Sequence, residues 1–185
     1  MKILVVLLIL VFHKEVYAQD ENPFAKIEYD SIVIYDFEGN GEGSDQSTII
    51  NKKNKFNSTI KKRQTLTNSE NKNLVNILGL KSSYGEYPAA CFEPHLGIVF
   101  YKKGKPVQYI TICMDCNRLV SSINIPGQQQ GKEVAEDGTT YYRLIGMSDG
   151  MRKHLNQLLK KYKFSHQRVK IKRVPIAIGT LFIFT

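Results

Sequence analysis

The sequence predicts a single small α+β domain built around a central antiparallel sheet. Three observations predict this class: a strand–turn–strand pattern that forms a hairpin over about residues 91–116, and two amphipathic helical segments, over about 68–78 and 149–163, that flank it. A chain of 185 residues fits one domain, which we expect to span residues 19–167.

The N-terminal segment, residues 1–18, is typical of a cleavable signal peptide. Lys2 supplies the charge, an apolar run extends from Ile3 to Phe12, and Ala18 is the small residue expected before the cleavage point. The apolar run is too short for a membrane-spanning helix, which needs about 20 apolar residues. We therefore expect export to the periplasm or the cell exterior after cleavage near Ala18, with no integral membrane segment in the mature chain.

The chain is basic, with a net charge of +9 at pH 7. The basic residues are scattered over four short segments, Lys52–Lys55, Lys61–Arg63, Lys160–Lys163 and Arg168–Arg173, and this scatter is typical of a solvated surface. Nucleic acid is not an expected partner of an exported protein. An anionic envelope polymer or a protein partner stays open.

The first predicted elements are a strand and a helix. Alternating apolar residues over Lys26–Phe37 predict a strand, and the Gly-rich polar residues 38–55 predict a loop or a hairpin connection. Thr67 and Glu70 form a capping box, and Gly79 ends the apolar periodicity that follows. This pattern predicts the helix over 68–78.

The predicted hairpin consists of two apolar strands, Gly97–Tyr101 and Val107–Cys113, around a turn that contains Gly104. Both strands are apolar on both faces, which favours a central position in the sheet. If the turn is centred between Lys103 and Gly104, Cys91 lies opposite Cys116 and His95 opposite Ile112.

The last third of the chain contains a polar excursion, a helix and a tail. Residues 126–139 are Gly-rich and polar, which predicts an exposed excursion. Ser148 caps the second helix, whose apolar stripe faces the core. Residues 168–185 are basic and then apolar, and we expect the apolar part to form a strand.

The one constellation with chemical content lies at the open end of the hairpin: Cys91, His95, Cys113 and Cys116. Three thiolates and an imidazole form the ligand set of a structural zinc site. In an oxidising compartment, however, a Cys91–Cys116 disulfide is the alternative, with Cys113 as a small buried hydrophobe. A redox pair of Cys113 and Cys116 is a third interpretation, although no helix is predicted after it.

Two short motifs carry a resemblance: Cys91-Phe92-Glu93-Pro94-His95 and Cys113-Met114-Asp115-Cys116-Asn117. With the surrounding residues 65–122 and 148–164, they resemble a functionally uncharacterised group of small exported proteins of Bacteroidota-type bacteria that carry C-F-x-P-H and C-x-x-C-N motifs. The resemblance implies one module that runs from the first helix through the hairpin to the second helix. It implies no activity.

Two classes of function remain open. The first is an exported, non-catalytic binding or structural module whose Cys/His cluster stabilises the fold. The second is a metal- or thiol-dependent enzyme of the periplasm or cell exterior that uses the same cluster. We favour the first class because the sequence shows no general base, no second histidine near the cluster and no obvious open coordination position.

Overall fold

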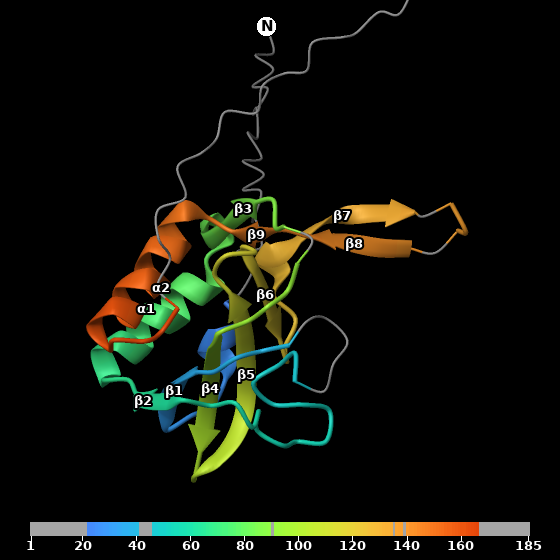
Figure 1. Ribbon diagram of the computed structural model, residues 1–185. Helices are drawn as coiled ribbons and strands as arrows, with labels where there is room; N and C mark the ends of the chain where they lie inside the picture. Colours follow the sequence, from blue (N-terminus) through green and yellow to red (C-terminus); the bar gives the residue numbers. More distant parts are fainter. Residues whose placement is uncertain (1–21, 41–45, 90, 135, 139, 167–185) are drawn as a thin grey trace, which may run out of the picture.

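A computed structural model describes residues 22–40, 46–89, 91–134, 136–138 and 140–166. The described chain has an antiparallel sheet with two helices against one of its faces (Figure 1). The predicted α+β class is therefore confirmed. The predicted signal peptide (residues 1–18) and the tail (168–185) lie outside the described residues.

The central sheet has five strands in the order β2-β1-β4-β5-β6, and every neighbouring pair is antiparallel. Its strands are β1 (Ser31–Asp36), β2 (Lys62–Thr65), β4 (Leu96–Lys102), β5 (Lys105–Cys113) and β6 (Arg118–Ser121). The chain enters this sheet later than the alternation over Lys26–Phe37 predicts. Pro23–Lys26 form a 3-10 helix, η1, because Asn22 caps the backbone N–H groups of Phe24 and Ala25.

The predicted hairpin is the β4–β5 pair, with its register changed at one point. At the turn, Lys102 faces Lys105 as predicted, but a bulge between Phe100 and Tyr101 shifts the pairing by one residue. Leu96, rather than His95, consequently faces Ile112. The His95 backbone N–H still donates to the Ile112 carbonyl at 3.2 Å.

Both predicted helices are present, as α1 (Asn68–Gly79) and α2 (Asp149–Lys161). Thr67 and Glu70 form the predicted capping box, and Ser148 caps α2. Glu70 also joins the helices, because it accepts hydrogen bonds from Tyr162 and Lys161. Burial alone raises the pKa of Glu70, but the hydrogen bonds from Lys161, Thr67 and Tyr162 outweigh it and lower the pKa to about 2.

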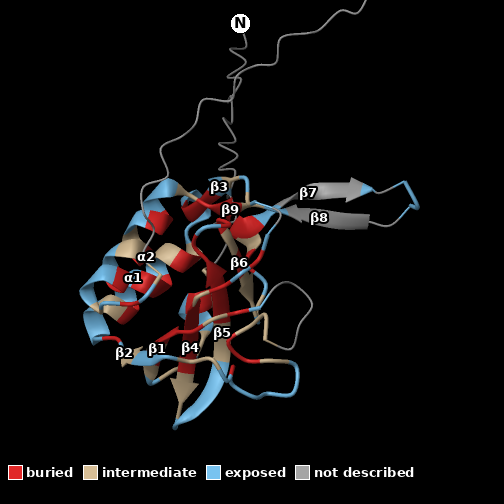
Figure 2. Ribbon diagram, viewed as in Figure 1, coloured by how far each residue is buried: buried red, intermediate tan, exposed pale blue. Residues whose placement is uncertain are grey.

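The main core lies between the helices and the inner face of the sheet (Figure 2). Its members include Ile32, Ile34, Ile98, Ile110 and Ile112 from the sheet and Leu74, Leu78, Leu155 and Leu159 from the helices. Strand β1 therefore supplies two fully buried isoleucines, Ile32 and Ile34, to this core.

A second, smaller core covers part of the outer face of the sheet. Ile49 and Ile50 pack there on Tyr35, Phe37 and Val99. Gly97 permits this cover, since a Cβ at that position would lie 2.5 Å from the Ile49 side chain. Strand β4 is thus largely buried on both faces, as its continuous apolar pattern predicted, whereas β5 is exposed near the turn.

Short elements complete the described chain: β3 (Tyr84–Glu86) pairs with β9 (Gly146–Met147), and β7 (Gln129–Val134) pairs with β8 (Thr140–Leu144). The 3-10 helices η2 (Lys81–Ser83) and η3 (Pro126–Gln128) precede β3 and β7. The β7–β8 ribbon projects from the body, and its first strand falls within the excursion predicted over 126–139 (Figure 1). Neither described helix is long and apolar enough to cross a membrane.

Candidate functional site

The structure joins Cys91 to Cys116 in a disulfide whose Cα atoms are 5.8 Å apart. The arms of the hairpin hold the pair, because the Ala89 N–H donates to the Cys116 carbonyl at 2.8 Å. Cys113 carries a free, buried thiol and packs with Phe92 and Cys116. This is the arrangement expected in the disulfide alternative.

The tetrahedral zinc site of Cys91, His95, Cys113 and Cys116 is not formed. Two of its four ligands are consumed by the disulfide, and the His95 ring instead contacts Glu38 and His166. Among the described residues, the group of metal-ligating side chains that converges is Glu38, His95 and His166. The zinc interpretation placed His95 near the cysteines only because of their spacing along the chain. In the structure the His95 side chain instead lies against the residues that follow β1.

Nothing around Cys113 resembles an activated thiol. Burial raises its pKa, although the Cys116 backbone N–H donates to Cys113 Sγ at 3.1 Å and opposes that rise. The chain continues from this motif into strand β6, so no helix N-terminus faces the sulfur.

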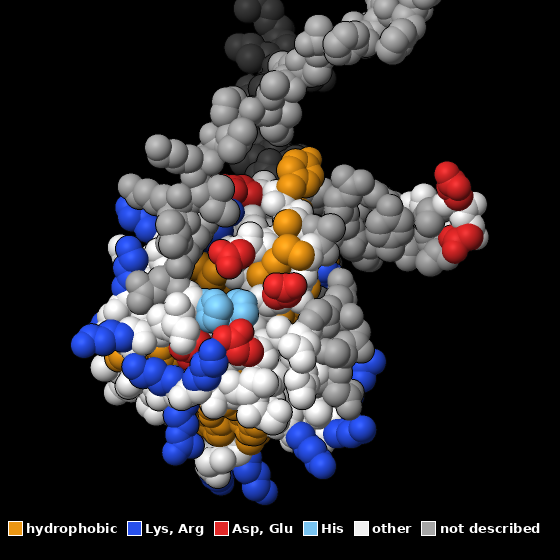
Figure 3. Space-filling model, viewed as in Figure 1, with side chains coloured by type: hydrophobic (Ala, Val, Ile, Leu, Met, Phe, Trp, Pro, Cys, Tyr) orange, Lys and Arg blue, Asp and Glu red, His pale blue; other side chains and the backbone are white. Residues whose placement is uncertain are grey.

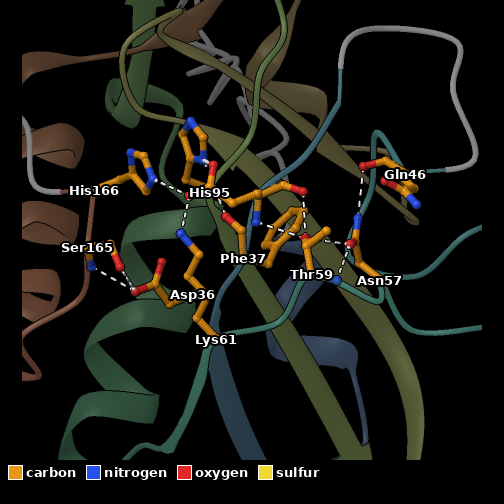
Figure 4. A network of polar contacts seen from close by, with 10 residues as sticks. Asp36, Phe37, Gln46, Asn57, Thr59, Lys61, His95, Ser165 and His166 are labelled. Atoms are coloured by element: carbon orange, nitrogen blue, oxygen red, sulfur yellow. Dashed lines mark hydrogen bonds and ion pairs between the residues drawn. The ribbon is translucent and has the colours of Figure 1, made fainter.

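The Glu38–His95–His166 cluster brings two imidazoles and one carboxylate together (Figure 4). The two rings are stacked with their centroids 3.4 Å apart and an interplanar angle of 6°. His166 Nε2 lies 3.1 Å from Glu38 Oε1, and His95 Nδ1 lies 3.3 Å from Glu38 Oε2. Both nitrogens therefore face the same carboxylate.

Three segments position these side chains. Glu38 follows β1 and His95 precedes β4, where backbone pairing continues past the strands: Phe37 N–H donates to the His95 carbonyl at 3.2 Å. Gly39 allows this close approach, because a Cβ there would lie 2.5 Å from the Pro94 ring. His166 comes from the segment after α2.

Asp36 anchors that third segment. Its Oδ2 atom accepts hydrogen bonds from the Ser165 backbone N–H and hydroxyl, both at 2.7 Å (Figure 4). Asp36 is only 2% exposed, and its Oδ1 atom has no hydrogen-bond partner among the described residues. The buried Asp36 carboxylate thus holds Ser165 in place, and this contact positions the neighbouring His166 imidazole.

Lys61 neutralises Glu38. Hydrogen bonds from Lys61 and His166 lower the pKa of Glu38 to about 2, against a smaller opposing effect of burial. The backbone of Glu38 is held separately, since its N–H donates to Thr59 Oγ1 at 2.9 Å and its carbonyl accepts from the same hydroxyl at 2.6 Å. Glu38 is therefore ionised and fixed in place at neutral pH.

Sequence reasoning identified His95 and missed Glu38 and His166. Those two residues are 128 positions apart, and no local spacing connects them. The available signal was the scarcity of histidine: only 4 occur in the chain, and two of them form the cluster.

The comparisons with known proteins add no relatives. No protein-family model matches this chain, and neither the curated proteins nor the solved structures give a match.

Proposed function

We propose that this protein is an exported, non-catalytic binding module that takes up a divalent transition-metal ion at Glu38, His95 and His166. The observation that carries the proposal is their convergence: one ligand atom from each residue lies within 4.8 Å of the others. Imidazole nitrogen with a single carboxylate oxygen suits zinc, nickel or copper, whereas calcium and magnesium prefer oxygen ligands.

Binding requires the two imidazole rings to leave their parallel stack, because an ion lies in the plane of each ring that holds it and the two ring planes are almost parallel. Zinc lies about 2.0–2.1 Å from histidine nitrogens, so two such nitrogens on one ion are at most about 4 Å apart. The ligand atoms of the cluster approach that separation without an ion, and backbone pairing and the Asp36–Ser165 contact hold the segments that carry them. The backbone is therefore preorganised, which confines the movement needed for binding to the ligand side chains.

Exchangeable binding suits this site better than a permanent structural ion. The side chains of Glu38, His95 and His166 are 39%, 16% and 34% exposed, so solvent reaches the ligands. Lys61 pairs with Glu38 Oε1 and competes with an incoming ion for that oxygen. Three protein ligands leave coordination positions for water, whereas structural zinc sites close all four.

Binding is favoured over catalysis by the state of Glu38. A general base works best when its pKa is near the working pH, and the pKa of Glu38 is about 2. In the complex Glu38 is also a ligand, and its remaining basicity is reduced further.

Export is part of the same proposal. Residues 1–18 carry the signal-peptide pattern, and the Cys91–Cys116 disulfide supports an oxidising destination, since such bonds are rare in reducing compartments.

Calorimetric titration of the chelator-treated mature chain with Zn²⁺, Ni²⁺ and Cu²⁺ tests the site. We expect one ion per chain, and loss of at least tenfold in affinity for His95→Ala and for His166→Ala. His154→Ala is the matched control, because His154 lies on α2 outside the cluster, and it should bind like the unmodified chain. Equal binding by His166→Ala, or no binding at millimolar metal, would overturn the proposal.

A further inference from the structure

The outer face of the sheet has one part that the second core leaves open. A cleft of about 360 Å³ lies there, within the size range of small-ligand sites. Its lining residues are Ser31, Val33, Tyr35, Arg63, Thr65, Tyr101 and Gly104.

Strand alternation builds this cleft from β1 and its two neighbours. Ile32 and Ile34 enter the main core, so Val33 and Tyr35 lie on the outer face. In β2, Thr65 pairs with Val33 and Arg63 pairs with Tyr35, which places the guanidinium group along one wall. Because these residues belong to hydrogen-bonded strands, the cleft is preformed.

The polar groups of the cleft are hydroxyls and one arginine. The Tyr35 and Tyr101 hydroxyls are hydrogen-bonded to each other, and Ser31 and Thr65 add two more. Burial and the Tyr35 hydroxyl raise the pKa of Tyr101, so the Tyr101 hydroxyl stays neutral at physiological pH. Other basic side chains form the ion pairs of the described residues. Arg63 has no ion-pair partner among these residues.

Positive charge surrounds the open side. The β4–β5 turn next to Gly104 carries Lys102, Lys103 and Lys105, of which Lys102 pairs with Asp30 at 3.3 Å. In the space-filling view, hydrophobic side chains gather at the end of the molecule near this turn, with lysine and arginine around them (Figure 3). The cleft is therefore an aromatic and hydroxyl-rich surface with a cationic border.

We propose that this cleft binds the uronic-acid units of an anionic polysaccharide. A guanidinium group pairs with a planar carboxylate through two parallel hydrogen bonds, and Arg63 has no ion-pair partner among the residues that the structure describes. The hydroxyls match sugar hydroxyls, and the partly exposed Tyr101 ring provides an apolar surface on which the C–H face of a sugar packs. The lysines of the turn continue the positive potential toward neighbouring units of the polymer.

Other occupants fit less well. A neutral glycan would bury Arg63 without a counter-charge, which is unfavourable. A membrane surface contacts protruding apolar groups, whereas this surface is hollow and contains four hydroxyls. The site is also separate from the proposed metal site, whose ligands come from beyond β1, before β4 and after α2.

Binding of the mature chain to polygalacturonate, measured by calorimetry in the presence of EDTA, tests the inference. We expect binding without metal, and about tenfold weaker binding by Arg63→Gln. Arg63→Lys retains the charge without the planar fork and should recover only part of the loss. The matched control is Lys153→Gln, which removes the same charge from an exposed position on α2, on the opposite side of the sheet, and should change affinity less than twofold.

The outcomes separate the alternatives. Equal losses for Arg63→Gln and Lys153→Gln would overturn the site in favour of general charge attraction. Equal binding of neutral dextran, or tighter Arg63-dependent binding of dextran sulfate than of polygalacturonate, would overturn the ligand class. Absence of polygalacturonate binding would overturn the inference and leave the metal proposal untouched, because that titration uses no polysaccharide.

Discussion

The disulfide cluster and the His/Glu cluster contain residues only four positions apart, Cys91 and His95, yet they are built in opposite ways. The disulfide joins the two arms of one hairpin, and Cys113 and Cys116 are almost fully buried. The His/Glu cluster is partly exposed and charged, and it needs three segments that are distant in the sequence. The open end of the hairpin therefore has two roles. Local pairing of its arms brings together the cysteines of a stabilising disulfide, and packing of distant segments against it forms a candidate binding site.

Removal of the disulfide should have the largest effect. The double variant Cys91→Ser/Cys116→Ser opens a loop with a sequence separation of 25, and we expect it to lose about 3 kcal/mol of unfolding free energy in urea titrations. Metal affinity in the folded state should change little, since the metal ligands are held by other contacts.

Reductant provides the control for this prediction. Dithiothreitol should bring the unmodified chain down to the stability of the double variant and leave the variant unchanged. A large loss of metal affinity in the folded double variant would show that the two clusters are not independent.

Asp36→Asn should have an intermediate effect on both properties. The amide weakens two hydrogen bonds to Ser165 in a buried position, so we expect a loss of roughly 1–3 kcal/mol of unfolding free energy. Zinc affinity should fall about tenfold, because Asp36 is a positioning residue for His166.

Glu70→Gln is the comparison variant for Asp36→Asn. It weakens the contact between α1 and α2 at a similar cost in stability but lies outside the cluster. If both variants lose stability and neither loses zinc affinity, Asp36 has no positioning role.

The smallest effect concerns Cys113. Burial raises the pKa of this thiol, so less thiolate is present at a given pH, and the native chain at pH 8 should react with iodoacetamide at least tenfold more slowly than the chain in urea. Mass spectrometry counts the added groups. Equal rates in the two states would contradict the closed, inert character assigned to the cysteine cluster.

The sequence predicted the cysteine cluster better than the metal-ligating cluster. The turn at Gly104 fixes which residues of the two arms meet, and this local register was enough to bring Cys91 near Cys116. No such rule links Glu38 to His166, whose approach depends on how α2 packs and on the contact of Ser165 with Asp36.

Two elements that the sequence did not predict, β2 and the β7–β8 ribbon, also depend on contacts outside their own sequence. Strand β2 has a mostly exposed, polar sequence, and it is a strand because the edge of β1 offers hydrogen-bonding partners. The β7–β8 ribbon likewise arises in a segment whose polar composition predicted only an excursion.

The sequence by itself determined the features that depend on neighbours along the chain: the capped helices, the hairpin and the approach of Cys91 to Cys116 at its open end. The tertiary structure alone decided which face of β1 entered the main core and where the outer face stayed open. It also decided which carboxylate met the two histidines. Local hydrogen bonds and short loops act through the chain, whereas these outcomes depend on distant segments packing together, and no spacing in the sequence encodes that packing.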